Sequence, residues 1–217
     1  MLLVIGDIHG FTSTYQKWLR KNTDEDQHTV QIGDMGLGFK GVGLHPMGPN
    51  HTFFRGNHDE PKKCRDHKNY RGDFGYDPNT GVFHIAGAFS IDRGMRVEGE
   101  SWWRDEELSY QELTQVLELY QRYRPRFVLS HEAPAKAAQT LLLSLIGPYF
   151  VEKMESSMSR TSEAMQHMLD IHQPEEWIFG HYHVDKDVHV PHYTTKFRCV
   201  GGILSSGEKP HTYELDT

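Results

Sequence analysis

Residues 1–10 read MLLVIGDIHG, an order of residue types typical of a buried strand that ends at a ligand-binding edge. The apolar run at 2–5 predicts a short strand buried on both faces. Gly6 ends this strand, and Asp7 and His9 follow at once. Because residues two apart in extended backbone project to the same side, we expect this carboxylate and this imidazole to converge. Open α/β sheets bind their ligands at that edge.

The same arrangement recurs four times further along the chain. Four more apolar runs end directly before polar residues that can bind metals: Asp34, then Asn57 with His58, then His131, then His181 with His183. Helical or loop segments lie between these runs, so the strands become parallel neighbours through crossovers. We therefore expect all five strand ends to lie on one rim.

The remaining pattern predicts an α/β protein. We expect strands at 2–5, 29–32, 51–55, 81–86, 88–91, 126–129, 176–179, 196–200 and 212–215, and helices at 12–21, 60–68, 109–124, 135–145 and 160–171. The helix at 109–124 begins with a capping box, Ser109 with Glu112. Residues 35–50 and 69–80 are rich in turn residues. No repeat or linker divides the chain, so we expect one domain over residues 1–217.

Composition narrows the class of protein. A net charge of −7 over 217 residues disfavours a broad surface for duplex nucleic acid, although a local basic pocket stays open. Two cysteines cannot form a disulfide framework, which favours a reducing compartment. No apolar stretch reaches membrane-spanning length, and the first apolar run is too short for a signal peptide. We expect a cytoplasmic protein with no membrane association.

The residues that directly follow the five predicted strands in the sequence indicate a metal centre. They combine imidazole, carboxylate and amide groups without thiolate, and the seven candidate ligands are Asp7, His9, Asp34, Asn57, His131, His181 and His183. Seven ligands exceed the needs of one ion, so we expect two divalent ions that share a bridging group. Mn²⁺ is the first expectation, with Fe, Zn²⁺, Co²⁺ or Ni²⁺ as alternatives.

Five short motifs carry a resemblance to a known family. Residues 6–10 (GDIHG), 33–36 (GDMG), 56–59 (GNHD), 130–134 (SHEAP) and 180–183 (GHYH) resemble, in order, the five blocks of the calcineurin-like metallophosphoesterases. Residues 101–103 (SWW), with acidic residues just after them, also resemble the small bacterial and phage members of that family. The resemblance implies an α/β fold, a β-sandwich of two mixed sheets flanked by helices.

The resemblance also implies a role for each candidate residue. Asp7, His9 and His183 would hold one ion; Asn57, His131 and His181 would hold the other; and Asp34 would bridge them. A hydroxide held between the ions would attack phosphorus directly. His58 would stabilise the transition state or protonate the leaving oxygen.

One difference between this chain and the family pattern bears on the identity of the substrate. Phosphoprotein phosphatases of this family carry a second Asp and an Arg in the second block, where this chain has Leu37 and Gly38. The usual carboxylate partner of the catalytic imidazole and a phosphate-binding arginine are therefore missing from these positions. Asp59 or Arg55 could replace them. Arg93 and Arg96, near the predicted turn at Asp92, are candidate phosphate contacts.

We therefore expect a phosphoesterase that hydrolyses phosphomonoesters or phosphodiesters of a small or flexible substrate. A nuclease that acts on DNA or RNA ends is the alternative within the same fold, and the net charge counts against it. A non-catalytic protein-binding scaffold, like the retromer subunit of this fold, is the alternative from another class. The pattern assigns no oligomeric state.

Overall fold

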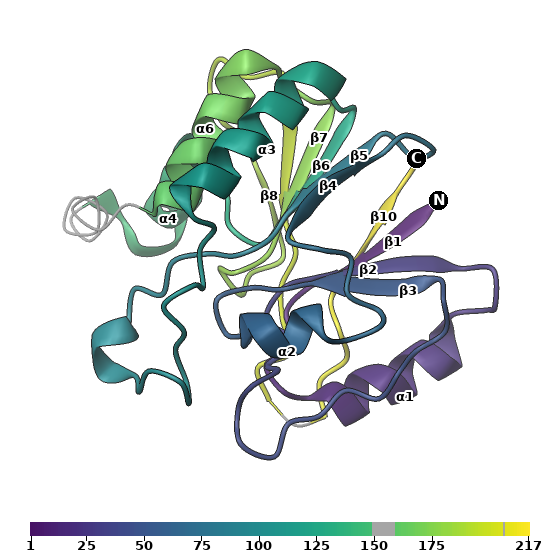
Figure 1. Cartoon of the computed structure of the whole chain (residues 1–217). Coiled ribbons are helices and arrows are strands. Elements are labelled where there is room, and N and C mark those ends of the chain that lie inside the picture. The colour runs from purple at the N-terminus through teal and green to yellow at the C-terminus, as the bar shows by residue number, and fades with distance from the viewer. Residues whose placement is uncertain (149–158, 206) are drawn as a thin grey trace.

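The computed structural model describes residues 1–148, 159–205 and 207–217. In this part of the chain two mixed β-sheets are flanked by helices on both outer sides, which confirms the expected fold class (Figure 1). The strands are β1 (Leu2–Ile5), β2 (His28–Ile32), β3 (His51–Phe54), β4 (Phe74–Asp77), β5 (Val82–Ile85), β6 (Phe127–Ser130), β7 (Glu176–Phe179), β8 (Lys186–Val188), β9 (Lys196–Cys199) and β10 (Thr212–Leu215). The helices are α1 (Thr12–Asn22), α2 (Pro61–Arg65), the 3₁₀ turn η1 (Arg93–Met95), α3 (Tyr110–Tyr123), α4 (Ala135–Ile146) and α6 (Arg160–Ile171).

The first sheet has four strands in the order β10-β1-β2-β3. Strands β1, β2 and β3 are parallel, and β10 runs antiparallel to β1. The outer face is covered by α1, where Ile5 and Phe53 of the sheet pack with Tyr15 and Leu19 of the helix. Strand β1 is thus buried on both faces, as its continuous apolar sequence predicts.

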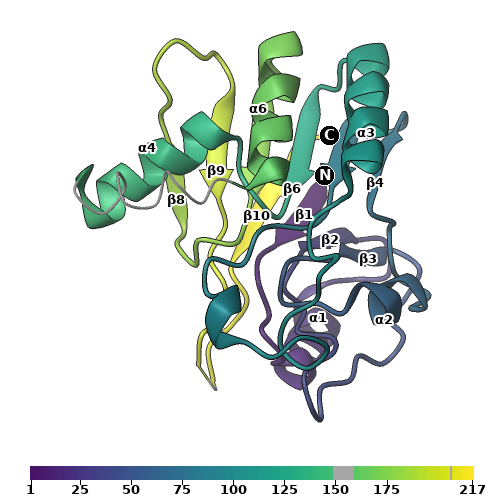
Figure 2. The same cartoon turned by 60° about the vertical axis from the view of Figure 1, so that its left-hand side comes forward.

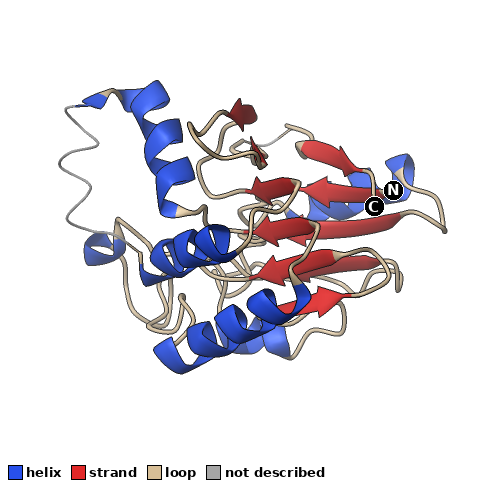
Figure 3. Ribbon diagram, turned by 90° about the horizontal axis from the view of Figure 1, so that it is seen from above, coloured by secondary structure: helices blue, strands red, loops and turns tan. Residues whose placement is uncertain are grey.

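The second sheet has six strands in the order β4-β5-β6-β7-β9-β8. The four central strands are parallel, and the edge strands β4 and β8 are antiparallel to their neighbours. Helices α3, α4 and α6 lie on its outer side (Figures 2 and 3). Trp177 and Phe179 of β7 pack there with Tyr120 of α3 and Met165 of α6.

The two sheets meet across a shared apolar core. Val4 and Val30 from the first sheet pack with Leu129 and Ile178 from the second. The expectation of a single rim is therefore wrong in one respect. The first three ligand-bearing strands end in one sheet and the last two, β6 and β7, end in the other, so face-to-face packing brings the five ends together.

Several local expectations differ from the structure. No strand forms at 88–91, because β5 ends at Ile85 and the chain turns at Gly87, whose φ is 86°. The turn-rich stretch 69–80 contains strand β4, which gains stability by pairing with β5. Helix α2 covers five residues rather than the nine expected. The segment 149–158, between α4 and α6, lies outside the described residues.

The capping box of α3 is confirmed. The Ser109 hydroxyl accepts a hydrogen bond from the backbone N–H of Glu112, and the Glu112 carboxylate accepts one from the backbone N–H of Ser109 at 2.7 Å. In the described part of the chain, no helix has both the length and the apolar character needed to cross a membrane.

Gly6 provides a test of how closely the chain is packed where β1 ends. A Cβ atom added at Gly6 would overlap the carbonyl oxygen of Gly201, whereas at Gly43 it would meet no atom within 4 Å. We expect Gly6→Ala to lower the free energy of unfolding by about 1–3 kcal/mol or more, as overpacking does. Gly43→Ala should change it by less than about 0.5 kcal/mol. Urea denaturation of both variants makes the measurement, and equal stabilities would contradict the expectation.

Candidate metal centre

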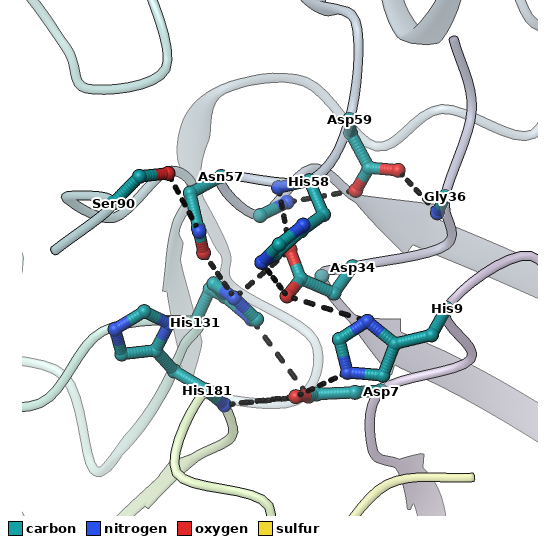
Figure 4. Close-up of polar contacts among 12 residues, drawn as sticks. Asp7, His9, Asp34, Gly36, Asn57, His58, Asp59, Ser90, His131 and His181 are labelled. Carbon is teal, nitrogen blue, oxygen red and sulfur yellow. Dashed lines mark hydrogen bonds and ion pairs between the residues drawn. The ribbon is translucent and has the colours of Figure 1, made fainter. Parts of the chain in front are cut away.

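The loops after β1, β2, β3, β6 and β7 bring the predicted ligands together where the two sheets meet (Figure 4). Asp7, Asp34 and His131 are completely buried there. His9 and His181 are partly exposed, and His183 is the most exposed of the candidate ligands in these two groups. The site is thus anchored in the protein interior and open on one side.

The first group of ligand atoms comes from Asp7, His9, Asp34 and His183, which lie close enough to share one ion. The Asp7 Oδ2 atom is 3.6 Å from His9 Nε2 and 3.5 Å from His183 Nε2. The two imidazole Nε2 atoms are 2.9 Å apart. One carboxylate oxygen and two ring nitrogens therefore surround a single point.

The second group comes from Asp34, His131 and His181. His131 Nε2 is 3.2 Å from Asp34 Oδ1, and the Asn57 Oδ1 atom lies 3.1 Å from the same nitrogen. Asp34 belongs to both groups, which is the arrangement that a bridging ligand requires. The division of the ligands into two sets parallels the one that the family resemblance implies, and the ligand assignment itself stays a prediction.

The backbone brings these side chains together by a route that the sequence did not predict. Four candidate ligands have left-handed backbone conformations: His9 (φ 48°), Asp34 (φ 56°), His181 (φ 69°) and His183 (φ 57°). The expectation that Asp7 and His9 converge because their backbone is extended is therefore wrong. The turn at His9 is instead held by hydrogen bonds from the N–H groups of Ile8 and His9 to the Asp34 carbonyl oxygen, at 2.9 and 2.8 Å. Such strained conformations cluster at functional sites.

Asn57 is oriented by two residues that no sequence motif marks. Its Nδ2 donates to Ser90 Oγ at 2.9 Å, and Ser90 Oγ donates to Glu106 Oε2 at 2.6 Å. This buried chain of hydrogen bonds fixes the amide so that Oδ1 faces His131. Ser90 and Glu106 lie 33 and 49 positions after Asn57 in the sequence and carry no local motif, so spacing alone could not identify them.

Asp59 has a structural role different from the one considered for it. Its carboxylate accepts four backbone N–H groups, from Met35 and Gly56 at Oδ2 and from Gly36 and Leu37 at Oδ1, at 2.7 to 3.1 Å. This carboxylate ties the loop after β2 to the loop after β3 (Figure 4). These four bonds engage both of its oxygens, so this carboxylate is not available as the partner of the His58 imidazole.

Arg55 is likewise unable to bind a phosphate. It is completely buried, its Nε donates to Asp73 Oδ1 at 2.6 Å, and its Nη1 donates to the Glu106 carbonyl oxygen at 2.5 Å. Its guanidinium group therefore holds the β5–α3 connection (residues 86–109) in place instead of facing the site.

His58 lies at the mouth of the site next to an arginine. Its backbone N–H donates to Asp34 Oδ1 at 2.8 Å, and its Nε2 is 3.3 Å from Arg96 Nη2. Arg96 is itself held by the Asp92 carboxylate, through Nε at 2.6 Å and Nη2 at 2.7 Å. A cationic group thus stands beside the imidazole that the resemblance implicates in catalysis.

The charges of the buried groups depend strongly on one another. Burial alone would lower the pKa of His131, but the Asp34 and Asp7 carboxylates reverse this effect and raise it to about 10. Burial opposes ionisation of Asp34, yet His131 and His58 hold the pKa of Asp34 well below its usual value. The buried carboxylates therefore need positive charge beside them. In the metal-free protein a protonated His131 supplies it.

The donor set fits divalent cations. The Asp34 Oδ2 atom is buried and has no hydrogen-bond partner among the described residues, although it faces the cluster. A Cβ atom added at Gly56 would overlap both Asp34 Oδ1 and His131 Nε2, so only glycine leaves the space that these ligand atoms share. His131 Nδ1 lies 2.9 Å from the Ile32 carbonyl oxygen, an acceptor that leaves Nε2 as the ring nitrogen for a ligand.

Metal binding should release a proton from His131. With a pKa of about 10, His131 is protonated at pH 7.5, and it must lose the Nε2 proton before it can bind an ion. We expect Mn²⁺ titration of the metal-free protein to release about one proton, and the affinity to rise with pH up to about 10. Calorimetry in buffers of different ionisation enthalpy measures the release. His131→Ala should abolish it, and equal heats in all buffers for the unaltered protein would contradict the expectation.

Comparison with known proteins gives the family. No curated protein matches the chain. A family model described as calcineurin-like phosphoesterase matches residues 1–185, a span that contains all seven candidate ligands and His58. Membership of this family, together with the two Asp/His groups, supports a metal-dependent phosphoester hydrolase. The chain therefore belongs to the calcineurin-like phosphoesterase family.

Proposed function

We propose that this protein is a dinuclear metal phosphoesterase that hydrolyses phosphomonoesters or phosphodiesters of a small or flexible substrate. The observation that carries the proposal is the position of Asp34, whose carboxylate belongs to both groups of ligand atoms. Asp7, His9 and His183 would hold one ion, and Asn57, His131 and His181 the other. Two divalent cations bound there would generate a nucleophile from water and neutralise phosphate charge. Mn²⁺ is the metal we propose first.

His58 is proposed as the catalytic side chain. It lines the cavity beside the ligands, and its Nε2 lies 3.9 Å from Asp34 Oδ2. Burial lowers the pKa of His58; Asp34 opposes this effect and Arg96 adds to it. A lowered pKa favours the neutral imidazole at pH 7. Hydrogen-bond stabilisation of the charge that develops on the phosphate is therefore the better supported of its two candidate roles.

The activity test compares three kinds of substrate with the Mn²⁺-loaded protein. Hydrolysis of p-nitrophenyl phosphate would indicate a monoesterase, and hydrolysis of bis-p-nitrophenyl phosphate a diesterase. Degradation of labelled DNA or RNA ends would favour a nuclease, which the net charge of −7 disfavours. No turnover with any of the metals named above would favour a scaffold, although a scaffold would gain nothing from so costly a set of buried polar groups.

Two substitutions test the roles of the site residues. Asp34→Asn should abolish activity with the fold intact, because it removes the charge that both ions would share. His58→Ala should lower kcat by roughly 10²–10⁴ and leave the metal content unchanged. His189→Ala, at an exposed histidine outside the site, is the control and should retain full activity. Steady-state kinetics, metal analysis and circular dichroism make the comparison, and full activity in His58→Ala would refute its role.

Arg96 should contact the substrate phosphate. It lines the cavity and lies beside His58, so it can supply the cation that the second motif lacks. Because hydrogen bonds to charged groups contribute about 1.5–3 kcal/mol, Arg96→Ala should lower kcat/KM by roughly 10- to 100-fold. The control is Arg93→Ala, in the same segment, since the Arg93 guanidinium lies over the Phe89 ring at 4.5 Å. An equal loss of kcat/KM in the two variants would show that any nearby positive charge has the same effect, and it would contradict a specific contact of Arg96 with the phosphate.

A further inference from the structure

A large cavity opens beside the candidate metal centre and extends toward helix α4. Its volume is about 790 Å³, and His9, His58 and His183 line one end of it. Pockets of about 300–1,000 Å³ hold organic ligands of drug size. The cavity therefore has room for much more than a phosphate group.

The lining of the cavity exposes more apolar than polar surface, although uncharged polar side chains such as Gln139 and Gln166 also belong to it. Ala135, Ala138 and Leu142 of α4 line the cavity, as do Ile91 of the β5–α3 connection and Leu204. Helix α4 and the β5–α3 connection project from the same side of the molecule (Figures 1 and 2). Ile91 and Leu204 are 66% and 55% exposed, so large apolar side chains are left open to solvent at a cavity. Such exposure is typical of a surface that contacts a ligand.

The charged groups of the wall argue against a polyanionic substrate. Among the described lining residues, Arg96 and Lys136 are the arginine and lysine side chains, and both have partners. Arg96 pairs with Asp92, and Lys136 Nζ donates to the Tyr193 hydroxyl at 2.8 Å. A nucleic acid or a polyphosphate needs several cations along its path. The wall suits an uncharged group better.

We propose that this cavity binds an uncharged apolar organic group of the substrate, an alkyl or aryl group, while the phosphate lies at the histidine end. The inference rests on the proposed function, since it describes the body of the phosphate ester that the metal centre would hydrolyse. Each methylene group that the cavity buries should increase affinity about fourfold.

Leu142 and Leu143 provide a matched pair for the test. Both belong to α4, but Leu142 is half-buried and lines the cavity, whereas Leu143 is 42% exposed and does not line it. Asparagine at either position removes apolar surface without adding charge near the phosphate. Leu204→Asn, at an exposed position of the same wall, is a second variant that should not disturb folding.

The experiment measures binding of methylphosphonate and octylphosphonate to the Mn²⁺-loaded protein by calorimetry. These probes cannot be hydrolysed, so the readout does not depend on turnover. We expect octylphosphonate to bind at least tenfold more tightly than methylphosphonate. Leu142→Asn and Leu204→Asn should each weaken octylphosphonate binding severalfold to tenfold and methylphosphonate binding less than twofold, and Leu143→Asn should change neither.

Equal binding of the two phosphonates, or no binding of either, would overturn the inference. So would a loss of octylphosphonate affinity in Leu143→Asn as large as in Leu142→Asn. Release of phosphate from ethyl phosphate and octyl phosphate is measured in parallel. If the octyl preference depends on Leu142 but neither ester nor bis-p-nitrophenyl phosphate is hydrolysed, the inference stands and the proposed function fails.

Discussion

Two carboxylates, Asp7 and Asp34, are completely buried where the two sheets meet, and much of the surrounding structure offsets the cost of burying them. Ring nitrogens from histidines surround both groups, and Asp34 also accepts the backbone N–H of His58. No single strand could supply these partners. Five loops from two sheets must approach one point, and this requirement explains the close contacts at glycine and the left-handed turns at several candidate ligands.

Much of this arrangement could be predicted from the sequence, because apolar runs that end before polar residues mark the carboxyl ends of buried strands. The order of the five motifs identified the family and the residues that the structure brings together. The local pattern of apolar residues could not show that two sheets meet at the site. Strands β1 and β6 belong to different sheets, but both appear in the sequence as short apolar runs. It also could not show the conformation at His9, because a turn held by the carbonyl oxygen of Asp34 depends on a contact 25 positions away. The domain count stays a prediction.

The β5–α3 connection accounts for most of what the motifs do not explain. It supplies Ser90 and Glu106, which orient Asn57, and Arg96, which stands beside His58. The strand expected at 88–91 lies in this same segment and does not form. Ser90 instead donates hydrogen bonds to the Glu106 carboxylate through both its backbone N–H and its hydroxyl. A segment with little regular structure thus supplies contacts to Asn57 and His58 that the five motifs do not encode.

The candidate ligands include only two carboxylates; the others are four imidazoles and one amide, which bind as neutral groups. Two divalent cations bring four positive charges, and the carboxylates of Asp7 and Asp34 cancel two of them. With the nucleophile held as hydroxide, the loaded centre proposed here would thus carry a charge of about +1, which favours the binding of phosphate ester anions. An amide rather than a third carboxylate at position 57 would leave the proposed centre positive enough to attract phosphate anions, and inorganic phosphate, the product of monoester hydrolysis, would then act as an inhibitor.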